Sequence, residues 1–309
     1  MDIIRKEYTY RSYSDIGDIF ARSWAPANPN EIKGIFQITH GMAEHGERYE
    51  DFANFLCHNG FVVYCNDHIG HGKSVVDDSM LGYFGKKCGW ISFVEDVEAL
   101  TDIATAEHPN LPVCLFGHSM GSFVARSYMR KYGNKIDKAI ICGTSGSNPA
   151  VGAGILLTKI IIKLKGEKHR SELINKIAFG SYNNKFKPAR TAFDWLTRDK
   201  DIVDKYVADK YCGFLFTARG YLDMFSILAD VSKDSWYNAL NKELPVLLIA
   251  GSMDPVGAYS KGVKEVYDKL KATGHKDVTL KLYADARHEI LNEADRITTY
   301  NDIVNWVKK

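Results

Sequence analysis

The stretch Leu115–Ser122, LFGHSMGS, places Ser119 between two glycines directly after an apolar run. The preceding residues, LPVCLF at 111–116, have the length and composition of a buried strand. The residues that follow repeat apolar side chains at near-helical spacing, and Gly133 ends that segment. A sharp turn from strand to helix exposes a serine hydroxyl, and the flanking glycines let the strand and the helix approach closely. The stretch therefore predicts that Ser119 is a nucleophile rather than an ordinary loop serine.

Strand-like and helical runs alternate along most of the chain. A short apolar run predicts a buried strand, and a longer run with helical periodicity predicts a helix. Their alternation is typical of an α/β fold, in which helices cover both faces of a parallel sheet. Residues 3–24 alternate with period two instead, so we expect an antiparallel hairpin at the sheet edge. The further predicted strands are 34–40, 61–67, 113–119, 136–143, 245–251 and 278–283, and the predicted helices are 48–60, 90–109, the segment after Ser119, 258–272 and 294–309.

The alternation stops between residues 145 and 242, where the sequence shows no clean strand and is mostly helical in pattern. A continuous sheet fold with an insertion between the sixth and seventh strands explains this better than two sequential domains. We therefore predict a single domain over residues 1–309, with a core at 1–144 and 243–309 and a cap at 145–242.

Composition and charge exclude several classes of protein. The 309 residues carry a formal net charge of +2, and no long basic stretch has interleaved aromatic residues, so we expect no nucleic-acid partner. The charged N-terminus lacks the apolar core of a signal peptide, and the longest apolar stretch, 150–166, is interrupted by Lys159 and Lys163 and is too short to span a bilayer. The six cysteines are scattered without a C-x-x-C spacing. We therefore expect reduced thiols in a cytoplasmic protein, with no metal site and no cofactor.

Two loops after the insertion supply partners for Ser119. A serine hydroxyl needs a base to take its proton and a third group to orient that base, and in hydrolase topologies these follow in the order Ser, Asp or Glu, His. Asp254 lies just past a buried strand, where ligands gather in open parallel sheets, although a turn or helix-capping role is the alternative. His288 follows the last strand, whereas the competing His275 lies at the wrong edge of the sheet. The predicted catalytic residues are therefore Ser119, Asp254 and His288.

This set of residues predicts acyl transfer. Ser119 attacks an ester carbonyl, His288 takes the serine proton and later donates it to the leaving alcohol, and Asp254 stabilises the imidazolium. Water then repeats the sequence on the acyl-enzyme. The negative oxygen of the intermediate needs backbone donors, and the N–H after the nucleophile, that of Met120, is one. The second is expected in the loop after the third strand, THGMAEHGERY, where we select the N–H of Met42.

Five motifs together resemble the monoacylglycerol lipase and lysophospholipase branch of the α/β-hydrolase superfamily, a group also classed with the serine aminopeptidases. The resemblance runs from about Gly34 to the C-terminus and implies a mostly parallel eight-stranded sheet, a mainly helical cap after strand six, and the same triad and oxyanion donors. Two residues depart from the pattern of this group. Ser122 stands where a glycine often follows GHSMG, and Ile69 stands where an arginine is common in the wider group, but neither residue touches the triad. The motifs are HGMAEHGERY (40–49), NDHIGHGKS (66–74), GHSMGS (117–122), GSMDPVG (251–257) and ARHEILNE (286–293).

Residues around these motifs are candidates for substrate binding. Glu44 and His45 would line the polar end of the site beside Gly41, or else stabilise their loop. His118 directly precedes the nucleophile and is expected to pack beneath the turn. Phe214 belongs to an apolar and aromatic segment, CGFLFTARGYLDMFSIL, which suits an acyl-binding cavity because ligand pockets are mostly apolar.

The segment GILLTKIIIKLKG at 154–166 has a broad apolar face with lysines on the other side. It would close over an acyl chain, make transient contact with a membrane surface, or simply pack on neighbouring helices. The sequence does not indicate an oligomeric state.

The sequence thus predicts a serine carboxylic ester hydrolase that cleaves a single-chain lipid ester, foremost monoacylglycerol to fatty acid and glycerol. The alternatives that keep the triad are a lysophospholipase, a short-acyl carboxylesterase, a thioesterase and an aminopeptidase. An aminopeptidase needs an acidic site for the free amine, and Glu172, Asp194 and Asp223 are the acids of the cap considered for it. A ligand-sensing protein on the same fold is the alternative outside enzymes.

Overall fold

The computed structural model describes residues 2–14, 16–86 and 89–309, so Cys88, one of the six cysteines, lies outside the described residues. These residues form an eight-stranded sheet in the order β1-β2-β4-β3-β5-β6-β7-β8, in which β2 runs antiparallel to both of its neighbours, β1 and β4, and all later neighbours in this order are parallel. The predicted edge hairpin and mostly parallel sheet are confirmed. The strands are β1 Ile3–Arg11, β2 Asp18–Pro26, β3 Gly34–Thr39, β4 Phe61–Asn66, β5 Val113–His118, β6 Lys138–Cys142, β7 Val246–Gly251 and β8 Val278–Tyr283.

Helices cover both faces of the sheet because successive residues of each central strand point to opposite sides. In β3, Ile35 belongs to one core cluster and Phe36 to the other, and Leu115 and Phe116 divide in the same way in β5. The first cluster contains residues of α2, α3 and α9, and the second contains residues of α1 and α10. These helices are α1 Glu50–His58, α2 Ile91–Glu107, α3 Met120–Tyr132, α9 Lys261–Ala272 and α10 Arg296–Val307.

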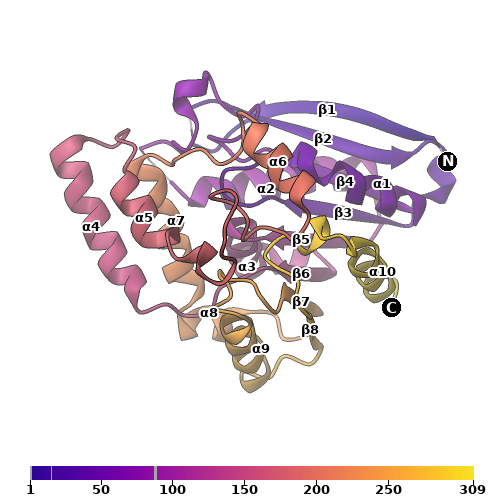
Figure 1. Ribbon diagram of the computed structural model, residues 1–309. Helices are drawn as coiled ribbons and strands as arrows, with labels where there is room; N and C mark the ends of the chain where they lie inside the picture. Colours follow the sequence, from indigo (N-terminus) through magenta and orange to yellow (C-terminus); the bar gives the residue numbers. More distant parts are fainter. Residues whose placement is uncertain (1, 15, 87–88) are drawn as a thin grey trace.

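The chain between β6 and β7 is mainly helical, as predicted. Figure 1 shows α4, α5 and α7 side by side at the end of the molecule that lies away from both termini. The last part of this insertion packs on the core, because Trp236 Nε1 in α8 donates to the carbonyl oxygen of Arg126 in α3 at 2.6 Å. The proposed cap limits, 145–242, stay a prediction. The helices are α4 Ala150–Lys165, α5 Glu172–Phe179, α6 Lys200–Ala208, α7 Ala218–Val231 and α8 Asp234–Ala239.

The predicted start of the helix after β7 is wrong. The periodicity places the start of the helix after β7 at residue 258, but α9 begins at Lys261. Ala258, Tyr259 and Ser260 have φ values of 49°, 56° and 75°, so three consecutive residues adopt left-handed backbone. A right-handed helix cannot include them, and the turn they form continues the loop that carries Asp254.

Candidate active site

Ser119 lies in a strained turn between β5 and α3. Its φ of 53° and ψ of −121° fall where non-glycine residues are rare, which is typical of a nucleophile held at the end of a strand. The two neighbouring glycines are required sterically. A Cβ on Gly117 would lie 2.4 Å from the carbonyl oxygen of Gly121, and one on Gly121 would lie 2.1 Å from that of Thr39 in β3.

Asp254 and His288 lie together at the ends of β7 and β8. His288 Nδ1 is 2.9 Å from Asp254 Oδ1, and both side chains are buried. Asp254 Oδ1 also accepts a hydrogen bond from the Val256 N–H at 2.8 Å, and this bond fixes the carboxylate within its turn. The imidazole of His288 packs against Trp195 of the insertion, with ring centroids 5.1 Å apart. An aspartate in this position can hold one tautomer of the imidazole and balance its charge.

His275, the competing histidine, lies elsewhere. It is buried in the connection between α9 and β8, where burial lowers the pKa of its imidazole to about 4. It does not belong to the described lining of the cavity that contains Ser119.

A cavity of about 1140 Å³ contains both Ser119 and His288 in its lining. Core loops supply the polar end, and the insertion supplies apolar walls that include Leu157 of α4, Ile177 of α5 and Phe225 of α7. This volume lies above the range of roughly 300–1,000 Å³ that is usual for small-molecule sites. The cavity therefore has room for a long apolar group next to Ser119 and His288.

The predicted oxyanion donors, Met42 and Met120, line the same cavity. Met120 is the first residue of α3, and the first N–H groups of a helix have no acceptor within it. The loop that carries Met42 is held on both sides of that residue. The Gly41 N–H donates to Glu44 Oε1 at 2.6 Å, and the carbonyl oxygen of Ala43 accepts from Gly213 N at 2.9 Å.

A buried cluster of charged side chains holds the loop that carries Met42 in place. The guanidinium of Arg48 donates to both carboxylate oxygens of Glu289, at 2.8 and 2.7 Å, and also to Glu44. Burial by itself would raise the pKa of Glu44, but Arg48 and His118 hold it well below its usual range. Burial also disfavours the charged form of His118, yet its contact with Glu44 raises the pKa of its imidazole. The sequence reasoning missed Arg48 and Glu289, although both belong to motifs that flank predicted catalytic residues.

The structure places four of the five predicted substrate-binding residues at the cavity, and His45 is the exception. Gly41, Glu44, His118 and Phe214 all line the cavity. His118 also contacts the loop that carries His288, because its Nε2 is 3.4 Å from the carbonyl oxygen of His288. His45 is outside the described lining, and its ring faces the loop between α6 and α7 instead.

Fold and site together define a serine hydrolase of the α/β-hydrolase class. The sequence pattern of the serine aminopeptidase S33 family matches residues 30–295, and the chain belongs to that family. The resemblance, the fold and the class of enzyme inferred from the sequence are thereby confirmed.

Individual relatives are lipases and esterases. The chain is 25% identical to a monoacylglycerol lipase of Mycolicibacterium smegmatis, over 98% of this chain and 97% of that protein. It is 27% identical to the human monoglyceride lipase, over 94% of this chain and 87% of that protein. A thermostable carboxyl esterase of Bacillus coagulans, solved in complex with glycerol, superposes with a TM-score of 0.92 at 31% identity and covers 98% of both chains.

Proposed function

We propose that this protein hydrolyses monoacylglycerols, the substrate class for which two of its relatives are named. The observation that carries the proposal is the large cavity, which joins Ser119 and His288 to apolar walls from three helices of the insertion. Such a shape suits one acyl chain with a small polar head group. We therefore also propose that residues 145–242 act as a cap over the site.

In the proposed reaction, the Oγ of Ser119 attacks the ester carbonyl while His288 Nε2 accepts the hydroxyl proton. The N–H groups of Met42 and Met120 donate to the oxyanion that forms, and each donor lowers the barrier by about 3 kcal/mol. The C–O bond to glycerol then breaks, and His288 returns the proton to the leaving glycerol oxygen. Water attacks the acyl-enzyme by the same route, releases the fatty acid and restores Ser119. Asp254 balances the charge of the imidazolium in both halves.

The aminopeptidase alternative lacks a free acid at the site. Glu172, Asp194 and Asp223 are all outside the described lining of the cavity. Of the carboxylates that do line it, Glu44 and Glu289 are paired with Arg48, and Glu265 accepts from the Ser147 hydroxyl and lies 3.4 Å from Lys269 Nζ. A substrate ammonium would therefore enter an apolar cavity without an unengaged partner, which is costly.

The test of substrate class compares kcat/KM for a 1-monoacylglycerol with kcat/KM for lysophosphatidylcholine and for an amino-acid p-nitroanilide. We expect the monoacylglycerol to be preferred over the anilide by at least about 1,000-fold, equivalent to about 4 kcal/mol, because an unpaired ammonium must be desolvated. Faster cleavage of the anilide would establish the aminopeptidase, and faster cleavage of the lysophospholipid would establish the lysophospholipase.

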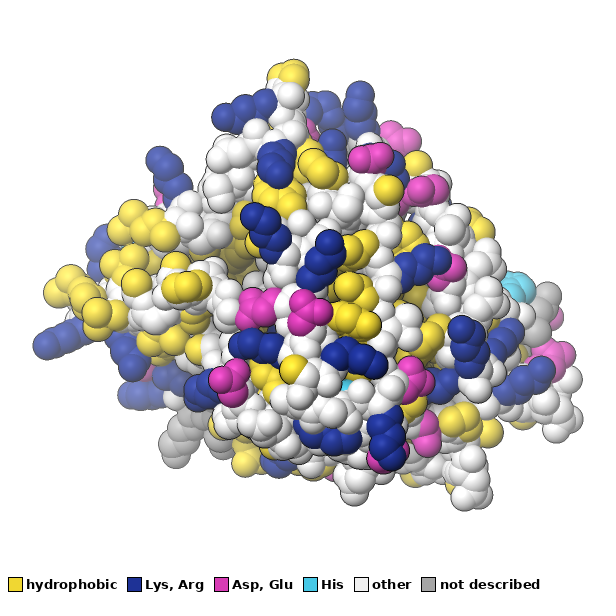
Figure 2. Space-filling model, turned by 90° about the horizontal axis from the view of Figure 1, so that it is seen from below, with side chains coloured by type: hydrophobic (Ala, Val, Ile, Leu, Met, Phe, Trp, Pro, Cys, Tyr) yellow, Lys and Arg dark blue, Asp and Glu magenta, His cyan; other side chains and the backbone are white. Residues whose placement is uncertain are grey.

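The cap also presents an apolar surface. Figure 2 shows hydrophobic and basic side chains together at the end of the molecule that carries α4. Among the described helices, none is long and apolar enough to cross a bilayer. We propose that this surface rests transiently on lipid, since an apolar helix face flanked by lysines binds at the membrane interface. The exposed apolar residues are Leu156, Ile160, Leu164, Leu173 and Ile177.

Vesicle sedimentation tests this contact. Exchanging both Ile160 and Leu164 for serine should lower the affinity for phosphatidylglycerol vesicles by about tenfold or more, because about 1.5–3 kcal/mol is gained for each large apolar side chain that is fully buried. The matched control is Ile297→Ser, which removes an equally exposed isoleucine from α10 outside the cap. Equal binding by the double variant and the wild type would exclude the cap as the contact surface.

A further inference from the structure

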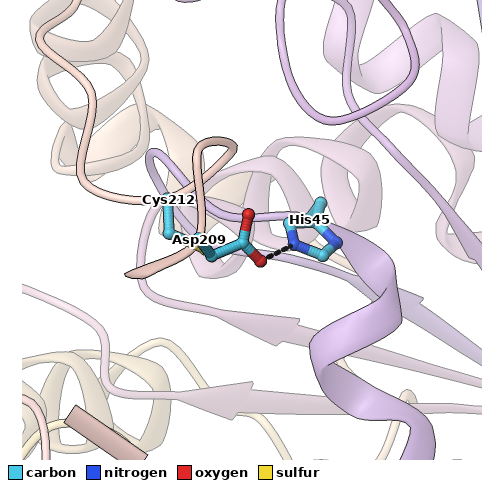
Figure 3. Close-up of side chains that lie close together, drawn as sticks. All are labelled: His45, Asp209 and Cys212. Carbon is cyan, nitrogen blue, oxygen red and sulfur yellow. Dashed lines mark hydrogen bonds and ion pairs between the residues drawn. The ribbon is translucent and has the colours of Figure 1, made fainter. Parts of the chain in front are cut away.

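Three side chains that commonly bind metals meet beside the loop of residues 40–45 that carries Met42, here called the oxyanion loop. His45 comes from the end of that loop, and Asp209 and Cys212 come from the connection between α6 and α7 (Figure 3). His45 Nε2 is 2.8 Å from Asp209 Oδ2. One nitrogen, one carboxylate oxygen and one sulfur of the three residues all lie within 4.8 Å of one another.

The ligand types and spacing suit Zn²⁺. Imidazole nitrogen, carboxylate oxygen and thiolate sulfur are its usual protein ligands, at about 2.0–2.3 Å from the metal. Neighbouring ligand atoms around a tetrahedral ion are therefore roughly 3.3–3.8 Å apart, so small side-chain movements would complete three corners of the site. The side chain of Asp209 is 32% exposed, which leaves water access for the fourth position.

The surrounding charges favour a cation. Asp209, Glu44 and Glu289 all act on the Cys212 thiol as negative charges, against the single positive charge of Arg48. A divalent ion would neutralise the excess negative charge that these groups place next to the thiol.

We propose that His45, Asp209 and Cys212 bind one Zn²⁺ ion, with water as the fourth ligand. The sulfur–zinc bond forms as the Cys212 S–H proton passes to solvent, and the metal keeps its +2 state. The sequence predicts no metal site because two of the three ligands are separated by 164 residues and no short motif joins them.

Bound zinc would connect the insertion to the oxyanion loop. The next residue after Cys212 is Gly213, whose N–H donates to Ala43 at 2.9 Å, and the hydroxyl of Tyr206 donates to the same carbonyl at 3.0 Å. Both sides of this contact would be fixed by ligands of a single ion. The proposal therefore includes a structural role, in which zinc stabilises the folded chain and restrains the loop that carries Met42.

Metal binding to the whole chain tests the proposal without using hydrolysis. Protein freed of metal with a chelator is titrated with ZnCl₂ in a calorimeter, and with CoCl₂ while the near-ultraviolet thiolate–cobalt band is recorded. We expect one ion per chain, a melting temperature that rises with zinc concentration, and a thiolate band with cobalt. The proposal would be overturned if no stoichiometric binding occurred at about 100 micromolar free zinc, a concentration well above the dissociation constants of usual protein zinc sites.

Variants identify the ligands. Cys212→Ser should remove the cobalt–thiolate band and weaken zinc binding by at least about tenfold, since loss of even an outer-shell partner has that effect. Asp209→Asn and His45→Gln should weaken it similarly. His58→Gln removes an exposed histidine and Asp78→Asn an exposed aspartate near the site, so both are controls that should retain full binding. Unchanged binding in Cys212→Ser and His45→Gln, with melting temperatures close to that of the wild type without metal, would assign the zinc to another place and contradict the proposal.

Discussion

Replacing Ser119 with alanine is expected to lower kcat for monoacylglycerol hydrolysis by about 10⁶-fold, because a nucleophile and its base act as a unit and the rest of the site cannot replace either. The substitution removes one oxygen from a turn that glycines and the backbone already define. The fold should therefore survive. The measurement is initial-rate release of fatty acid by purified wild-type and variant protein at saturating substrate.

A serine from the same cavity provides the control. Ser147 also lines the cavity, but its hydroxyl donates to Glu265 at 2.5 Å. Ser147→Ala should keep kcat within about tenfold of the wild type, since it removes no group that bonds to the reacting atoms. A Ser119→Ala protein that retains more than a few per cent of the wild-type rate would show that another group attacks the ester.

The fold could be predicted from the sequence because its elements are encoded locally. Each central strand is a short apolar run, and the segment after Ser119 has both a helical period and a glycine stop. The order of these elements then limits the topology to a parallel sheet with an insertion. The start of α9 was missed because left-handed backbone at Ala258–Ser260 leaves no periodic signal, and these residue types rarely adopt it.

The candidate site was only partly predictable. Ser119, Asp254 and His288 each follow a strand that ends at the same edge of the sheet, so their strand positions imply that they lie close together. Their catalytic roles stay predictions until variants are measured. The Arg48–Glu289 pair joins residues 241 positions apart, and it depends on how η2 (Gly46–Tyr49) sits against the loop after β8.

The walls of the cavity depend on packing as well. The lining from α4, α5 and α7 is set by how these helices lie against one another and the core, which a pattern of apolar residues does not specify. The pattern predicted an apolar segment around Phe214, and the structure places that residue at the cavity. It could not distinguish side chains that face an acyl chain from those that pack on a neighbouring helix, since both are apolar.

Chain-length preference is the second large effect expected. Each methylene that moves from water into the cavity contributes about 0.8 kcal/mol, which corresponds to about fourfold in kcat/KM when that binding is retained in the transition state. A cavity of about 1140 Å³ has room for many methylenes beside Ser119. We therefore expect kcat/KM to rise at least about 100-fold between acetyl and dodecanoyl glycerol, and then to level off when the chain fills the cavity.

The most direct test of the account is kcat/KM for 1-monoacylglycerols of increasing chain length, measured below the concentration at which each substrate aggregates, with Ser119→Ala as the blank. Rates that rise to medium or long chains, and that disappear in the blank, are the predicted result. Turnover of the shortest acyl groups alone would contradict it, because the apolar walls of the insertion would then be packing surface and the enzyme a short-acyl esterase.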